Sequence, residues 1–251
     1  YYWGGNPMDK YIELKERILN KGWVESTATG NAAVGITLEN MLGKERENFE
    51  IPDYNGIEIK SKCSVRDNNI TLFSSVPDSY LFETKRLLET YGYHDDEYQN
   101  FKIFNVVLNT KYMTYVKSKY YLKLSIDYRL QQLILNVYGI NGEFIENNAR
   151  WSFQLLKEKL ERKLKEMAFV EAERKWCPYR KKVYFRYHTV TIYKLKSFTK
   201  FIELIDDGTI SVTFNVSVYR DLRRLGKIYD HGTIFRISKF DIEKLFDKID
   251  V

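Results

Sequence analysis

Apolar side chains recur every three or four positions in four parts of the chain, which is the spacing of an amphipathic helix. In the first part, Tyr11, Leu14 and Ile18 share one face, and Gly22 follows as a helix-ending residue. In the third part, the hydroxyl of Ser152 can cap the first turn, and charged residues fill the face opposite the leucines. The pattern predicts helices over residues 8–21, 36–42, 152–167 and 198–206.

Other segments alternate apolar and polar residues, which is the period of a β-strand with one buried face. Asn55-Gly56 separates two such pieces and is a strong signal for a two-residue hairpin turn. The strand-like segments are residues 49–62, 102–137, 169–173, 183–193 and 210–219, followed by an expected loop over residues 220–232. This mixture predicts an α/β or α+β fold in which a mixed sheet is flanked by helices.

Composition indicates one folded domain with a substantial core. The chain has 251 residues, 44% of them hydrophobic, with only 13 glycines and 4 prolines, which excludes disordered and low-complexity classes. No apolar run approaches the ~18 residues needed to cross a bilayer, so membrane insertion is excluded. Residues 1–7 precede the first methionine and are interpreted as a leader or an added remnant, which leaves residues 8–251 as a single domain.

The cysteines indicate a cellular compartment and exclude one kind of metal site. Cys63 and Cys177 are the only two, and they stand far apart without a CxxC pair. They therefore supply neither a disulfide framework nor a cysteine metal site, which is typical of a protein in a reducing cytoplasm. The signatures of a Walker phosphate loop, a dinucleotide fold, a zinc protease and a serine hydrolase are also absent from the sequence.

Positive charge is concentrated in one fifth of the chain. The formal net charge is +6, whereas residues 151–200 have 14 basic and 5 acidic side chains, or +9. The densest part, residues 174–187, interleaves aromatic and basic residues, among them Arg180, Lys181 and Lys182. Such a stripe suits a phosphate backbone and favours nucleic-acid binding. The alternative is a solvated strand pair whose long basic side chains cover apolar surface.

The segment around Asn-Gly brings two acids and an amine together. If the dipeptide forms the loop, Tyr54 pairs with Ile57 and Asp53 stands opposite Glu58. Two carboxylates on neighbouring positions of one face repel each other. Lys60, two residues beyond Glu58 on the strand, shares that face.

A divalent cation would relieve this repulsion. Mg²⁺ is suited because it takes oxygen ligands, keeps several waters and binds through one or two carboxylates plus phosphate. Lys60 would then orient or activate the attacking water and stabilise charge that develops on a phosphate. The alternative is a surface hairpin in which Lys60 only offsets its acidic neighbours.

The hairpin sequence, PDYNGIEIK, has the form of a PD-(D/E)xK nuclease core. Four other segments of the chain also have the form of recognisable motifs. They are TGN-x3-G-x-T-L-E at residues 29–39, TLF at 71–73, WSF at 151–153 and DHGT-x-FRI at 230–237. Together they resemble the MvaI/BcnI group of restriction endonucleases, which is more distantly related to the MutH mismatch-repair nickase. The likeness extends from Leu14 to Ile237, nearly the whole chain.

The resemblance implies a restriction-endonuclease-like fold, with a mixed β-sheet core flanked by helices and a DNA-recognition lobe. It implies that Asp53 and Glu58 are ligands of Mg²⁺ and that Lys60 is the catalytic lysine. It also implies that the acid Glu39 reaches the same site from the preceding helix.

The resemblance further places the DHGT segment at the DNA, which makes Asp230, His231 and Arg236 candidates for base contacts. On the preceding strand, where family members have charged base-reading side chains, this chain has Thr213 and Asn215 on the polar face. Asn prefers the adenine edge, and Thr is permissive. We therefore expect a target that differs from the short GC-rich sites typical of the family.

The leading hypothesis is a Mg²⁺-dependent type II restriction endonuclease that cuts a short site in double-stranded DNA. The resemblance implies a monomer that nicks each strand in turn, with a cognate DNA methyltransferase in the same cell. The catalytic lobe is expected mainly within residues 8–135 and the DNA-recognition lobe mainly within residues 150–240. Two alternatives remain, a MutH-like nickase activated by a partner protein and a catalytically silent, sequence-specific DNA-binding module.

Overall fold

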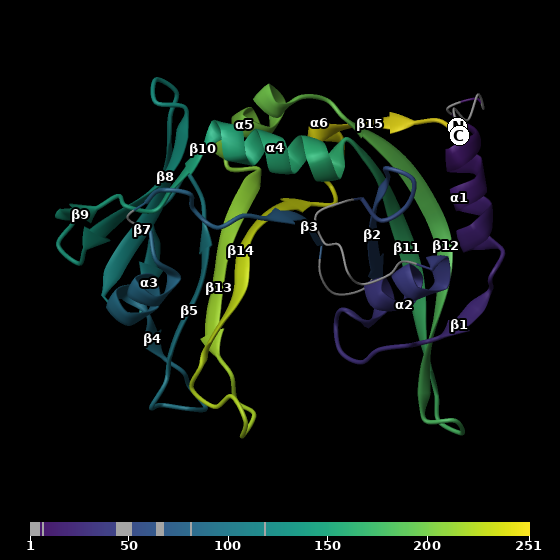
Figure 1. Cartoon of the computed structure of the whole chain (residues 1–251), viewed down its shortest axis with the longest axis horizontal. Coiled ribbons are helices and arrows are strands. Elements are labelled where there is room, and N and C mark those ends of the chain that lie inside the picture. The colour runs from purple at the N-terminus through teal and green to yellow at the C-terminus, as the bar shows by residue number, and fades with distance from the viewer. Residues whose placement is uncertain (1–5, 7, 44–51, 64–67, 81, 118) are drawn as a thin grey trace. The chain divides into compact units, whose positions relative to one another are not determined.

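The structure is a computed structural model of the chain. It describes residues 6, 8–43, 52–63, 68–80, 82–117 and 119–251 (Figure 1). The expected leader at residues 1–7 lies outside the described residues except for Asn6.

Six helices form within the described residues, and four of them lie where the apolar periodicity predicts them. They are α1 (Asp9–Leu19), α2 (Ala33–Leu42), α3 (Thr84–Tyr91), α4 (Phe153–Leu164), α5 (Phe198–Asp206) and α6 (Ile242–Leu245). Gly43, with φ at 79°, ends α2, and the hydroxyl of Ser197 accepts the amide of Lys200 at the start of α5. Ser152 caps α4 as predicted, accepting the amide of Leu155 at 3.2 Å. None of these described helices is both long and apolar enough to cross a membrane.

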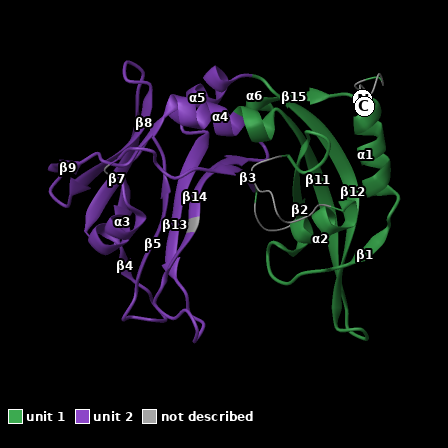
Figure 2. Ribbon diagram, viewed as in Figure 1, with its two compact units in different colours: residues 1–68, 161–196, 242–251 green, residues 69–160, 197–241 purple. Residues whose placement is uncertain are grey.

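The chain divides into two compact units (Figure 2). Unit 1 contains residues 1–68, 161–196 and 242–251, and unit 2 contains residues 69–160 and 197–241. Both units are discontinuous in sequence, because helix α4 and the segments after Asn68, Lys196 and Asp241 pass from one unit to the other. The division therefore differs from the continuous lobes expected over residues 8–135 and 150–240.

Unit 1 is built on a mixed sheet covered by α1 and α2. Its strands are β1 (Trp23–Glu25), β2 (Glu58–Cys63), β11 (Glu166–Cys177), β12 (Lys182–Leu195) and β15 (Phe246–Ile249). Their order is β1-β12-β11-β2, and β15 also pairs with β12. Among these strands, β2 and β11 pair in parallel and the other pairs are antiparallel. The core joins the apolar faces of the two helices to Ile57 and Ile59 of the hairpin and to alternate residues of β11 and β12.

The strands β11 and β12 form one long hairpin rather than the two shorter strands that the sequence predicts. Pairing runs from Glu166 with Lys194 to Cys177 with Lys182, with an irregularity between Glu171 and Ala172. Within the described residues, β2 pairs with the first half of β11, Met167–Ala172, and β1 pairs with residues 184–186 in the second half of the hairpin.

Unit 2 contains two antiparallel sheets. The first has the order β10-β8-β7-β6 with β9 beside β8, and the second has the order β3-β14-β13-β5-β4. The strands are β3 (Asn69–Ser74), β4 (Tyr93–His94), β5 (Lys102–Leu108), β6 (Thr114–Val116), β7 (Tyr120–Asp127), β8 (Gln132–Gly139), β9 (Phe144–Glu146), β10 (Arg150–Ser152), β13 (Ile210–Val218) and β14 (Ile228–Ser238). Strand β14 begins inside the segment 220–232 that was expected to be a loop, so that expectation was wrong at its C-terminal end.

The side chain of Trp151 occupies the centre of unit 2. It is fully buried, and its ring lies 5.9 Å from that of Phe214 and 6.2 Å from that of Phe235, measured between centroids. Its Nε1 donates a hydrogen bond of 2.7 Å to the backbone oxygen of Ser75. One side chain thus joins β10, β13 and β14 and also satisfies a polar group that packing has removed from water.

We predict that Trp151→Phe lowers the free energy of unfolding by about 1–3 kcal/mol, because the oxygen of Ser75 loses its donor inside the core. Urea denaturation followed by circular dichroism measures the loss. Trp176→Phe is the matched control, since Trp176 is 51% exposed and should change stability by no more than about 0.5 kcal/mol. Equal losses in the two variants would contradict a specific role for Trp151.

Candidate active site

The Asn-Gly hairpin forms with the register that the sequence predicts. Tyr54 and Ile57 form an antiparallel bridge, with amide-to-oxygen distances of 3.0 Å and 2.7 Å. The two loop residues both have positive φ, 44° for Asn55 and 82° for Gly56, as this turn type requires. The bridge agrees with the predicted register, in which Asp53 directly precedes Tyr54 and Glu58 directly follows Ile57.

The carboxylate of Asp53 is bound to the strand that follows the turn. Its Oδ2 accepts the backbone N–H of Ile59 at 2.7 Å, which holds the acid beside the first residues of β2. Asp53 is half-buried, whereas Ile57 and Ile59 are 0% and 6% exposed and point into the core. The alternation expected for a strand therefore separates the acids from the isoleucines.

Glu58 is a buried acid with two ammonium neighbours. Its side chain is 2% exposed, and its Oε1 lies 2.7 Å from Nζ of Lys60 and 3.3 Å from Nζ of Lys163. The two lysine side chains are 19% and 24% exposed. Lys163 comes from the last turn of α4 and belongs to unit 1, like the hairpin itself. A charge this deeply buried is stable only because such partners are close.

The other oxygen of the same carboxylate, Oε2 of Glu58, is buried and has no hydrogen-bond partner among the described residues. Buried polar atoms in folded proteins nearly always have partners, and an exception indicates a missing ion, water or ligand. A divalent cation fits this observation, because Mg²⁺ binds through one or two carboxylates and fills its remaining positions with water and phosphate. Glu58 and Asp53 are the acids that could hold it.

Glu39 is not part of a preformed carboxylate cage. It lies half-buried on α2, a helix that packs on β2. Among the residues that the structure describes, no three histidine, cysteine, aspartate or glutamate side chains are grouped as a metal site. Glu39 therefore does not complete a three-acid cluster with Asp53 and Glu58, and its place in the active site stays a prediction.

The sequence analysis assigned no role in the site to Lys163, although a signal for one exists. Lys163 follows Leu156 by seven positions and Leu160 by three, so it lies on the face of α4 that holds these fully buried leucines. A lysine in an apolar helical stripe is unusual and indicates a buried counter-ion. Which acid it would meet could not be predicted, because Glu58 is 105 residues away in sequence.

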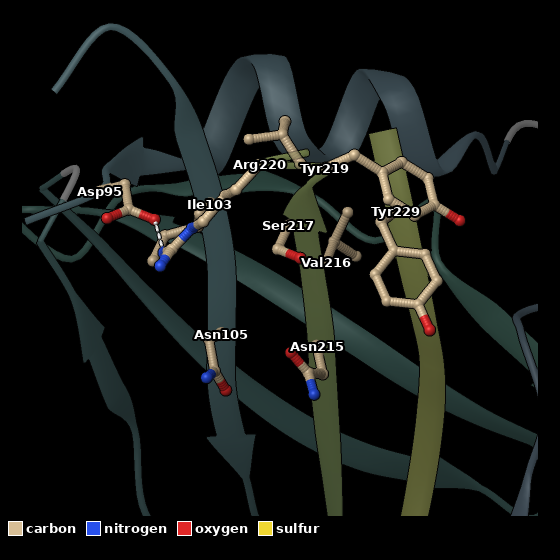
Figure 3. A pocket seen from close by; sticks show the side chains of 10 residues that line it. Asp95, Ile103, Asn105, Asn215, Val216, Ser217, Tyr219, Arg220 and Tyr229 are labelled. Carbon is tan, nitrogen blue, oxygen red and sulfur yellow. Dashed lines mark hydrogen bonds and ion pairs between the residues drawn. The ribbon is translucent and has the colours of Figure 1, made fainter. Parts of the chain in front are cut away.

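A second polar region lies in unit 2, on the face of β13 turned away from the apolar core. Asn215 of β13 stands directly opposite Asn105 of β5, and both line a pocket of about 430 Å³ (Figure 3). Arg220 lies at the edge of this pocket, where it pairs with Asp95. The predicted residue Thr213 lies on the same strand but is only 4% exposed, and its buried Oγ1 has no partner within the described residues.

The residues predicted from the DHGT segment lie along β14. Asp230 accepts the backbone N–H of Gly232 at 2.7 Å and the hydroxyl of Thr84 at 3.0 Å, so both of its oxygens are used within unit 2. The side chain of His231 lies outside what the structure describes. Arg236 pairs across the sheet with Ser211 and Thr71, and none of the described residues offers its buried Nε a hydrogen-bond acceptor.

The basic segment 174–187 forms the outer half of the β11–β12 hairpin. Arg180 and Lys181 lie exposed in the turn, with φ of Lys181 at 51°. Lys182 instead pairs with Glu25 of β1 at 2.5 Å, and this contact raises the pKa of the lysine and lowers the pKa of the acid. A count of charges along residues 174–187 alone omits this acid, so the local positive charge is smaller than the sequence indicates.

A family model and two solved structures that resemble this chain all point to the same protein family. The model of the MvaI/BcnI restriction endonuclease family matches residues 12–246. A solved structure described as a complex of restriction endonuclease MvaI with its cognate DNA substrate is 27% identical, with a TM-score of 0.87 over 98% of this chain and 99% of that chain. The structure of restriction endonuclease MvaI in the absence of DNA is also 27% identical, with a TM-score of 0.62 over 99% of both chains. A search of curated proteins found no match.

We predict that Gly56→Val destabilises the hairpin by about 1–2 kcal/mol or more, because a β-branched residue is strained at a φ of 82°. Amide hydrogen exchange should then be faster at Ile59, whose N–H is bound to Asp53. Gly35→Ala is the control, since a Cβ there would meet only Oγ of Ser61 at an ordinary 3.6 Å. Unchanged exchange at Ile59 in the valine variant would show that the turn does not fix Asp53.

Proposed function

The chain belongs to the MvaI/BcnI restriction endonuclease family, and on that premise we propose that it is a type II restriction endonuclease that hydrolyses phosphodiester bonds at a short, specific sequence of double-stranded DNA. The family consists of site-specific deoxyribonucleases. The single observation that supports this activity in the chain itself is the hairpin that brings Asp53, Glu58 and Lys60 together, with one buried oxygen of Glu58 left without a partner.

We propose Mg²⁺ as the cofactor, held by Asp53 and Glu58. When bound, the ion supplies Lewis-acid stabilisation of the phosphate and lowers the pKa of a coordinated water. Lys60, whose Nζ is fixed by Glu58 at 2.7 Å, orients the attacking water and stabilises the negative charge that develops on the phosphate oxygens. Glu39 remains a proposed fourth member, approaching from α2.

The proposed DNA contacts fall into two groups. On unit 2, Asn215, Thr213 and Arg236 lie on neighbouring strands, and the two last have buried polar atoms that lack partners. We propose that these side chains read base edges, since Arg bonds guanine and Asn bonds adenine. Asp230 and His231 complete the proposed base-reading group. On unit 1, Arg180, Lys181 and Lys182 would contact phosphates and add affinity without sequence preference.

We further propose that the protein acts as a monomer that nicks the two strands in turn, because each chain has one such hairpin. A cell that contains it would need a cognate DNA methyltransferase to protect its own copies of the target. The protein has no need of a membrane for this activity.

We predict that supercoiled plasmid DNA is converted to discrete fragments in Mg²⁺ and is left intact in EDTA. Lys60→Ala and Glu58→Gln should each slow cleavage by about a thousandfold or more. The first removes a positive charge beside the reacting phosphate, and the second removes a ligand of the proposed Mg²⁺. Lys157→Ala, at an exposed lysine of α4, is the control and should cut at the wild-type rate. Sequencing the fragment ends gives the target.

The order in which products appear tests the monomer. Sequential nicking requires a nicked circle that rises before linear DNA, whereas direct linearisation would indicate a dimer. Nicked circles that never become linear would favour a partner-activated nickase. Tight binding without cleavage of any DNA in Mg²⁺ would instead support a silent binding module, and wild-type cleavage by folded Lys60→Ala would contradict the assignment of that lysine.

The turn between β11 and β12 gives a separate prediction, which concerns the affinity for DNA. The double variant Arg180→Ala/Lys181→Ala should weaken binding to all duplexes alike and reduce the slope of log K against log salt by about 0.9 for each phosphate that is no longer neutralised. Fluorescence anisotropy at several salt concentrations measures the slope, with Lys157→Ala as the control. Weaker binding confined to the target sequence would mean that these side chains contact bases.

A further inference from the structure

Glu58 has two ammonium neighbours, and only one of them belongs to the D-x4-E-x-K hairpin. The second, Lys163, approaches from α4 to within 3.3 Å of the oxygen that Lys60 contacts at 2.7 Å. We propose that Lys163 is a positioning residue that holds Glu58 in the metal-free protein and makes divalent-ion binding depend on bound DNA. This inference rests on the proposed function, because it concerns the same site.

The first argument is the charge of the site. The two proposed metal ligands, Asp53 and Glu58, contribute two negative charges, and the two lysines that contact Glu58 contribute two positive charges. A divalent cation that approaches the two carboxylates therefore also meets two ammonium groups, which repel it. Because the side chain of Glu58 is 2% exposed, little water is present to screen this repulsion. The acids alone would match the charge of Mg²⁺, but the acids with both lysines do not.

The second argument is the way the contacts are distributed. Both ammonium groups lie at Oε1 of Glu58, while Oε2 is buried and accepts no hydrogen bond from the part of the chain that the structure describes. An ion pair with a purely structural role is stable in a core when hydrogen bonds satisfy both oxygens. Here the lysines fix one oxygen and leave the other available, so they hold the carboxylate in an orientation that suits a metal while opposing the metal by charge.

DNA supplies the charge that is missing. Each phosphate brings one negative charge, and Lys60 and Lys163 can bind its oxygens in place of Oε1 of Glu58. The site then regains a net negative charge, and the cation is attracted rather than repelled. DNA and metal thereby strengthen each other's binding, and the coupling is equal in both directions. Lys163 contributes to the strength of this coupling. Unlike Lys60, it has no other proposed part in the reaction.

The test measures Mn²⁺ binding by isothermal titration calorimetry, without DNA and without turnover. Lys163→Met should bind Mn²⁺ more tightly than the wild type by about tenfold or more, in the range of typical coupling factors. Lys157→Met, at the exposed lysine of the same helix, and Lys163→Arg, which keeps the charge, should match the wild type. Equal or weaker Mn²⁺ binding by Lys163→Met would overturn the proposal, since removal of a merely structural side chain weakens the site.

Lys163→Gln provides the same test if the methionine variant does not fold, because glutamine can still donate a hydrogen bond to Glu58 without the charge. In a second titration, a short duplex that the protein binds but does not cut should tighten Mn²⁺ binding to the wild type and tighten it less in Lys163→Gln. Equal tightening in both proteins would refute the coupling role. Cleavage by the wild type with no effect of Lys163 on Mn²⁺ binding would reject this inference alone, whereas absence of cleavage in every divalent metal would reject the proposed function.

Discussion

The burial of one carboxylate constrains the whole of unit 1. Glu58 is 2% exposed, so its negative charge is balanced by neighbouring ammonium groups rather than by water. Lys60 of the same strand and Lys163 at the end of α4 both form ion pairs with Glu58. The second pair links the end of that helix to β2. Asp53, bound to the amide of Ile59, keeps the turn closed. The mixed sheet and the two covering helices supply the apolar surroundings that make these few polar contacts decisive.

The parts of the site that the sequence predicts are those set by local rules. Asn55 and Gly56 determine the turn by their positive φ, the turn determines the pairing of Tyr54 with Ile57, and the strand period then places Lys60 beside Glu58. Helices α1, α2, α4 and α5 follow from apolar periodicity and local caps in the same way. Family resemblance, which extends over most of the chain, agrees with the comparison of folds.

The parts that the sequence does not predict depend on residues far apart in the chain. Glu25 neutralises Lys182 from a neighbouring strand, and Lys163 reaches Glu58 from a distant helix. Thr213 has the alternation of an exposed face yet is buried, because strand period specifies a direction and not what covers it. Each of the two compact units is made of interleaved segments, and composition has no means of showing where a chain leaves one unit and returns to it.

That interleaving also affects how the protein is made. Strand β2 leaves the ribosome long before β11, its parallel neighbour, and Glu58 precedes Lys163 by 105 residues. At about 5–20 residues per second, synthesis of that interval takes roughly 5–20 s. During this time the nascent chain contains the complete D-x4-E-x-K sequence but neither the sheet neighbour nor the second cation. A translation product that stops before residue 163 therefore has the D-x4-E-x-K sequence without Lys163 and without the strand that pairs with β2.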